Sequence, residues 1–142
     1  MGRRTLVVVP RSDDGFDCRY AHWGVGVAPI AQSTPLGSDW SAAAVFDELD
    51  AGYDRLFVGT AEPSRYCVCW LDVTLADPDD VVVARTDDPD GLAAAWTEAK
   101  SRAVDAVAAG AAPDTARGAL CEDLGRRADA VHHDASFLRD AR

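Results

Sequence analysis

The residues best suited to chemistry in this sequence lie close together, between Arg19 and Gly24. His22 carries an imidazole that titrates near neutral pH, and Trp23 offers an aromatic surface for stacking. Arg19 and Tyr20 supply hydrogen-bond donors, and Gly24 allows a ligand to approach the backbone. The cluster predicts a binding corner, and His22 is the candidate catalytic residue if the protein is an enzyme.

The sequence does not identify a reaction. Serines and aspartates are plentiful, but none lies in a recognisable nucleophile elbow or triad. One hypothesis is a small hydrolase or transferase that uses His22 as general acid or base, helped by Arg19 or Tyr20. The structural alternative is a histidine at a strand end that bonds to the next loop, with Trp23 covering the core. No cofactor is expected from either interpretation.

Four cysteines raise the question of a metal site: Cys18, Cys67, Cys69 and Cys121. Cys67 and Cys69 are two residues apart, which places both thiols on one face of a strand. A metal-binding protein could use this pair with Cys18, completed by His132-His133. Structural zinc sites, however, usually take paired cysteines from a turn, with a second pair nearby. The spacing therefore favours reduced, buried core residues, and no metal is expected.

The charge of the chain distinguishes a surface that binds cations or nucleic acid from a surface adapted to high salt. Asp and Glu total 24 and Lys and Arg total 14, so the formal net charge is −10, and Lys100 is the only lysine. A surface that binds cations has no reason to exclude lysine throughout, whereas a salt-adapted surface avoids its exposed hydrocarbon stem. We therefore interpret the acidity as adaptation to high salt. The scattered arginines argue against binding nucleic acid.

The elements that position the cluster begin with a hairpin. Thr5–Val9 is apolar and β-branched, which indicates a buried strand, and the turn that follows ends at Gly15, which is free to adopt positive φ. A second strand completes a hairpin over residues 4–23, in which Tyr20 and His22 share one face and Arg19 and Trp23 the other. A loop from Gly24 to about Ser38 follows.

Ser38 is the expected N-cap of a helix over about residues 39–51, with Trp40 facing inward. Strands are expected within about 54–84, the longest from Arg65 to Leu75, and a helical part within about 91–131, beginning after Asp90 and with Pro113 opening its last helix. The order ββαβββαα predicts one α+β domain over residues 1–142, a mostly antiparallel sheet of about five strands with helices packed on it. The sequence contains no recognisable signal peptide or membrane span, so we expect a cytoplasmic protein.

The N-terminal residues Met1-Gly2-Arg3-Arg4, followed by a Leu/Val strand, a turn and Tyr20-x-His22-Trp23-Gly24, resemble a family of short uncharacterised haloarchaeal proteins. The likeness covers about the first quarter of the chain. It supports the salt interpretation, but the family has no established activity, so it implies no catalytic residue.

The leading functional hypothesis is a non-enzymatic protein-interaction module of a halophilic archaeon or its virus. It would present the Trp23–Ser38 loop and the nearby sheet edge to a protein partner, with homo-oligomerisation as a further option. Nucleic acid and membranes are not expected partners.

Overall fold

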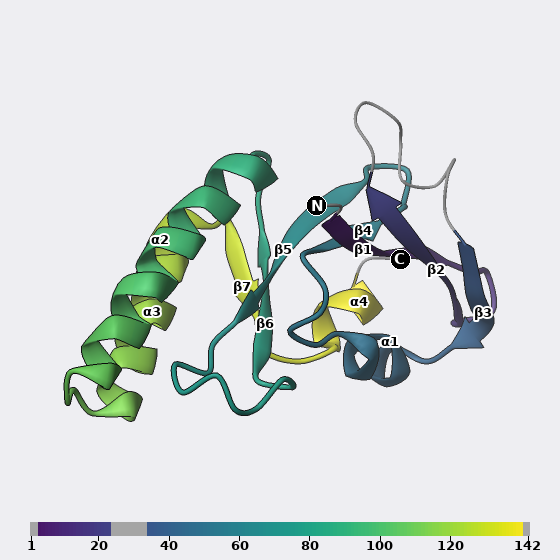
Figure 1. The fold of residues 1–142 in the computed structure, drawn as a ribbon. Helices are drawn as coiled ribbons and strands as arrows, with labels where there is room; N and C mark the ends of the chain where they lie inside the picture. Colours follow the sequence, from purple (N-terminus) through teal and green to yellow (C-terminus); the bar gives the residue numbers. More distant parts are fainter. Residues whose placement is uncertain (1–2, 24–33, 141–142) are drawn as a thin grey trace.

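The computed structural model describes residues 3–23 and 34–140. These residues form one mixed sheet with helices packed on it (Figure 1). The seven strands run in the order β3-β2-β1-β4-β5-β6-β7, and five of the six pairings are antiparallel, whereas β1 and β4 are parallel. The strands are β1 (Arg3–Pro10), β2 (Phe16–Trp23), β3 (Thr34–Trp40), β4 (Arg55–Val58), β5 (Ser64–Trp70), β6 (Val81–Arg85) and β7 (Ala130–His132). The helices are α1 (Ala42–Glu48), α2 (Pro89–Ala108), α3 (Pro113–Arg127) and α4 (Ser136–Asp140). The predicted α+β class is confirmed, but the sheet has seven strands instead of about five.

The N-terminal hairpin forms where the sequence predicts it. Its turn is closed by the Arg11 N–H, which donates to the Gly15 carbonyl at 2.8 Å. The Arg11 guanidinium also contacts the carboxylates of Asp13 and Asp17, each at 3.1 Å. The left-handed residue is Asp14, with φ of 71°, and not the predicted Gly15. Aspartate tolerates this conformation because its short polar side chain can bond locally.

The main error of the sequence prediction lies at β3. Thr34–Trp40 is a strand, where the sequence predicts the end of a loop and, from Asp39, a helix. Near the end of the strand, Asp39 adopts a left-handed backbone, with φ of 63°, which a helix beginning at Asp39 does not allow. The helix is capped by Ser41, whose hydroxyl accepts a hydrogen bond from the Ala44 N–H at 3.1 Å. Ser41 and not Ser38 is therefore the N-cap, and α1 is shorter than predicted.

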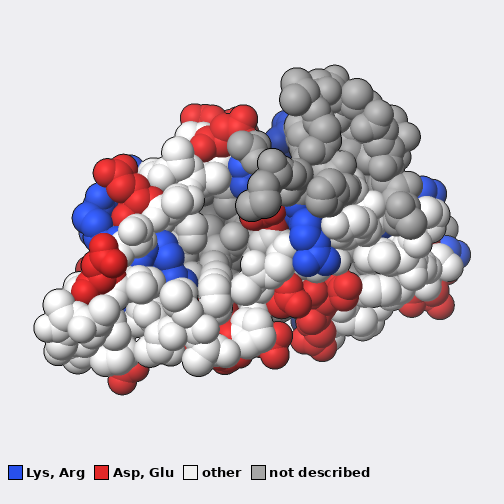
Figure 2. All heavy atoms as spheres, in the orientation of Figure 1, with Lys and Arg blue, Asp and Glu red and all other residues white. Residues whose placement is uncertain are grey.

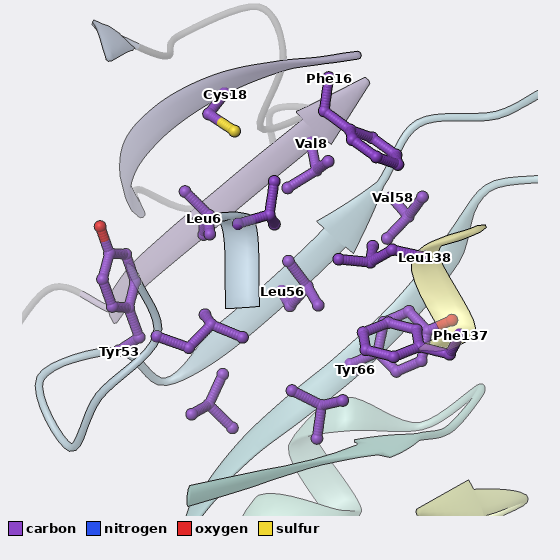
Figure 3. Packing of buried hydrophobic residues seen from close by; sticks show 14 of the residues in the cluster. Leu6, Val8, Phe16, Cys18, Tyr53, Leu56, Val58, Tyr66, Phe137 and Leu138 are labelled. Atoms are coloured by element: carbon purple, nitrogen blue, oxygen red, sulfur yellow. The ribbon is translucent and has the colours of Figure 1, made fainter. Parts of the chain in front are cut away.

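The two faces of the sheet carry separate apolar layers. On one face, α1 and α4 cover a cluster that includes Leu6, Leu56 and Tyr66 (Figure 3). On the other face, α2 and α3 cover the β5–β6 region, where Cys67 and Cys69 are buried. Alternation along β5 thus buries side chains on both faces, because each face has its own helical layer.

β5 is shorter than the predicted strand, which extends to Leu75. It ends at Trp70, and a turn follows in which the Asp72 carboxylate accepts hydrogen bonds from the N–H groups of Thr74, Ala76 and Asp77. Together with the Thr74 hydroxyl, these donors hold the pKa of Asp72 below its usual range. Leu75, which the alternation places in the core, is 51% exposed.

The helical hairpin α2–α3 corresponds closely to the prediction. The cap of α2 is Asp88, whose side chain accepts from the Gly91 N–H, where the sequence predicts Asp90. α3 begins at Pro113 as predicted but ends at Arg127, because the chain then enters β7. Among the described residues, no helix combines the length and apolarity needed to cross a bilayer.

Two basic side chains of this hairpin, Lys100 and Arg117, form hydrogen bonds to the sheet and its loops. The Arg117 guanidinium holds the Asp80 carboxylate through two hydrogen bonds, of 2.7 and 2.9 Å. The Lys100 ammonium group, on α2, donates a hydrogen bond to the Trp70 carbonyl, and its Nζ lies 4.8 Å from the centroid of the Trp70 ring. Burial lowers the pKa of Lys100.

Two short elements near the C-terminus are absent from the prediction. β7 pairs antiparallel with β6 and forms one edge of the sheet. α4 then places Phe137 and Leu138 against the core; Figure 3 shows both beside Val58 and Tyr66. The Phe137 ring lies 5.2 Å from the Tyr66 ring and stacks on His132 at 4.6 Å, between centroids. Neither element is long enough to show a hydrophobic period.

We expect Leu138→Ala to show that α4 is part of the core. Leu138 has no exposed surface, so truncation should lower the free energy of unfolding by about 3 kcal/mol. Leu75→Ala is the matched control, because Leu75 is largely exposed and its loss should cost less than about 0.5 kcal/mol. Urea denaturation followed by tryptophan fluorescence measures both. Equal stability of the two variants would contradict the packing of α4.

Candidate functional site

The predicted cluster of five residues is divided by the geometry of β2. Arg19 pairs with Val7, whereas Tyr20 pairs with Leu6 and packs against the cluster covered by α1 and α4. Consecutive strand residues point to opposite faces, so Arg19 and Tyr20 cannot line one pocket on a single face. The side chains of His22 and Trp23 and the whole of Gly24 lie outside the described residues. A general acid or base role for His22 stays a prediction.

Tyr20 belongs to an aromatic and cationic cluster with Arg4 and Tyr53. The Arg4 guanidinium lies 5.3 Å from the Tyr20 ring centroid and 5.1 Å from that of Tyr53, and its Nε donates to the Tyr20 hydroxyl at 3.2 Å. This hydrogen bond raises the pKa of Arg4. A Cβ at Gly52 would come within 2.5 Å of Arg4 Nη1, so a larger residue there would displace the end of the Arg4 side chain. The arrangement supports a structural role for Tyr20.

The opposite face of the same strands carries arginines that sequence reasoning did not group. Arg19, Val7, Phe57 and Arg65 form a row across β2, β1, β4 and β5. The Arg65 guanidinium lies 5.8 Å from the Phe57 ring centroid. Among the residues that the structure describes, no carboxylate pairs with Arg19 or Arg65. No sequence motif could reveal this row, because its members come from four strands.

Beside this row, Thr5 is a buried polar residue with an unsatisfied hydroxyl. It is 1% exposed, and its Oγ1 has no hydrogen-bond partner within the described part of the chain. It pairs with Arg55, whose guanidinium instead contacts Asp90 at 3.2 Å. A buried hydroxyl without a partner costs stability.

The three cysteines of the metal hypothesis do not converge. Cys18 lies in the cluster beneath α1 and α4, whereas Cys67 and Cys69 lie in the cluster beneath α2 and α3, on the opposite face of the sheet. All the cysteines are free thiols. Burial raises the pKa of Cys18 to about 12 and also raises that of Cys69, which disfavours the thiolate that a metal needs. His132, offered as a further ligand, stacks on Phe137.

The open edge of the sheet, β3, is the strongest candidate for a binding surface. Within the described residues it pairs only with β2, so one side of its backbone has no strand beside it. Leu36, near the middle of the strand, is 41% exposed; the only other exposed large apolar side chain in the described ranges is Leu75. An edge strand with an exposed apolar side chain can accept another strand.

A shallow, open depression, called the Trp40 cavity below, lies where β3 meets α1. It has a volume of about 570 Å³ and is lined by Asp39, Trp40, Ser41, Ala44, Asp47 and Glu48. The half-buried Trp40 indole packs back on its own strand: a Cβ at Gly37 would lie 2.5 Å from Trp40 Nε1, so a larger residue there would displace the indole. The sequence prediction placed Trp40 on a helix and so missed this site.

Carboxylates dominate the lining of this cavity. Among the described side chains, no arginine, lysine or histidine forms an ion pair with Asp39, Asp47 or Glu48. Glu48 is oriented by the Tyr53 hydroxyl, which donates to it at 3.2 Å. Burial raises the pKa of Tyr53, so the hydroxyl stays protonated as a donor. Figure 2 shows acidic side chains spread over both ends of the visible face, so acidity alone does not mark the cavity.

The fold and this edge define an α+β protein with a mixed sheet and an open edge strand. Residues 1–64 match the model of a family of unknown function, DUF6735. No curated protein and no solved structure matches the chain. The matched segment contains β1 to β4 and α1, and therefore the whole of the edge strand and its cavity. The match supports a family likeness over the N-terminal part of the chain, and the haloarchaeal origin and the Tyr20-x-His22-Trp23-Gly24 motif stay predictions.

We expect Thr5→Val to stabilise the protein. Valine has nearly the same shape and removes a buried hydroxyl that lacks a partner, so the free energy of unfolding should rise by about 1 kcal/mol. Urea denaturation of the two proteins measures the difference. A loss of stability of similar size would show that Oγ1 has a partner in solution.

Thiol labelling tests the placement of the cysteines. At pH 8, a thiol with a pKa near 12 is ionised in only about one molecule in ten thousand, so Cys18 should not react with Ellman's reagent in the folded protein. Cys67 and Cys69 are buried and should also be protected, whereas Cys121 is partly exposed and should react first. Cys121→Ser should abolish this early labelling. Rapid labelling of Cys18 would contradict its burial.

Proposed function

We propose that this protein is a protein-interaction module that binds an extended segment of a partner along the open side of β3. The observation that carries the proposal is the edge position of β3 together with the exposed Leu36. In strand addition, backbone hydrogen bonds supply affinity, and contacts to alternate side chains supply specificity. The match to a family of unknown function includes β3 and leaves this function open.

The two edges of the sheet differ in their suitability for this role. β7 has three residues, all partly buried, and its neighbour α3 also contacts it. β3 has seven residues, and Pro35, Leu36 and Ser38 are exposed. Proline lacks an N–H, and charged residues discourage uncontrolled pairing at edges. Pro35 and Asp39 therefore confine an added strand to the short stretch between them, which favours a specific partner.

The setting that we propose is the cytoplasm of a halophilic archaeon, or of a host infected by its virus. The formal net charge of −10 and the single lysine support salt adaptation. In such a cytoplasm, long-range electrostatic attraction is screened. A module would then rely on direct contacts, such as backbone hydrogen bonds and the burial of Leu36.

A peptide selection tests this function. A displayed library of random peptides, selected against the protein in molar KCl, should yield a convergent set of extended sequences. Binding should protect from hydrogen exchange those backbone amides of β3 that face away from β2, because an added strand accepts their hydrogen bonds.

The variant Leu36→Glu should weaken binding of the selected peptides by at least about tenfold. Leu75→Glu is the matched control: it makes the same change at the other exposed leucine, in the turn after β5, and should bind like the wild type. A library without convergent binders, or binding that Leu36→Glu leaves unchanged, would reject the module.

A further inference from the structure

We infer that the segment bound by β3 carries an arginine or lysine at the Asp39 end of the strand, and that this side chain occupies the Trp40 cavity. This inference rests on the proposed function and specifies its partner as an extended basic segment. Its basis is charge complementarity at the point where the edge strand opens into a carboxylate-lined cavity.

The position of the cavity connects it to the edge. Asp39 and Trp40 are the last two residues of β3, and the cavity extends from them to Asp47 and Glu48 at the end of α1. A strand added to β3 therefore passes the cavity at one end. A long side chain at that end of the partner can lie in this open depression, which has a volume of about 570 Å³.

The lining combines the two chemistries that recognise organic cations. Trp40 lines the cavity and is only partly buried, and an indole attracts a guanidinium or ammonium group that reaches its ring face. Asp39, Asp47 and Glu48 offer carboxylates, which accept charge-assisted hydrogen bonds from the same groups. An apolar or acidic side chain would satisfy neither chemistry.

The carboxylates of the cavity differ from those that an arginine of the chain already holds. Asp13 and Asp17 share Arg11, and Asp80 is held by Arg117, so those carboxylates are neutralised within the chain. Asp47 and Glu48 instead lie in the last turn of α1, which contains no basic residue. Negative charge at the carboxyl end of a helix is unfavourable, and a bound cation relieves it.

A second copy of this chain is the competing occupant of β3. Self-association through β3 would bring no cation to either cavity, because Thr34–Trp40 contains no arginine or lysine. A basic segment supplies the missing charge. Charge complementarity thus favours a basic partner over self-association.

Two matched peptide libraries test the inference separately from the proposed function. One library includes arginine and lysine at every position, and the other excludes both. We expect convergent binders from the first library alone, with a basic residue at one fixed position. Binders of equal affinity from both libraries would overturn the basic partner but leave the module intact. No binders from either library would overturn both.

Charge-neutralising variants locate the contact. Combining Asp47→Asn with Glu48→Gln should lower the affinity for the selected basic peptide by about tenfold. An analogue of this peptide in which uncharged citrulline replaces the basic residue still depends on Leu36 for binding. The double variant should leave the affinity for this analogue unchanged. Asp105→Asn removes an exposed carboxylate from α2 and should have no effect. Equal affinity of wild type and the double variant would place the basic residue elsewhere. In sedimentation, a dimer that Leu36→Glu dissociates would assign the edge to a second copy and overturn the inference.

Discussion

The burial of β1 on both faces is the constraint on which the rest of the structure depends. Leu6, Val7 and Val8 are consecutive, so their side chains alternate between the faces, yet none has exposed surface. Such a strand must be central, and β1 lies between the antiparallel β2 and the parallel β4. The parallel pairing requires a long connection, which contains β3 and α1. The edge strand and its cavity are thus products of the crossover that β1 imposes.

The elements predicted from sequence are those whose local pattern and tertiary environment agree. β1 has a β-branched run, and α2 and α3 have helical periodicity with proline near each start. β3 was missed because it contains Pro35, Gly37 and Asp39, which disfavour a strand. It is a strand because β2 supplies its hydrogen bonds and an edge tolerates proline. Pairing of this kind cannot be derived from local propensity.

The candidate site shows a similar limit. The sequence hypothesis placed the binding surface at the Trp23–Ser38 loop and the nearby sheet edge, and the structure forms a strand, β3, over Thr34–Trp40. The sequence alone could not show that Arg19 and Tyr20 lie on opposite faces of the sheet, in different clusters. It also could not show that Trp40 lines a cavity at the end of β3, where a helix was predicted. These relations depend on which strands become neighbours. The alternation of side chains along β2 could be predicted from the sequence. Its consequence, that Arg19 and Tyr20 do not share a site, depends on the layers that cover each face of the sheet.

Salt adaptation and partner recognition impose different demands on the same carboxylates. On an open surface, a carboxylate in molar salt is hydrated, and its field extends only about 3 Å. Within a cavity beside an indole, it can contact a cation directly, and screening then matters much less. Under the proposed function, the acidic surface and the Trp40 cavity need no separate explanation of their charge. Exposed aspartates would keep the protein hydrated, and Asp39 at the end of β3 would contact the basic residue that an added strand brings there.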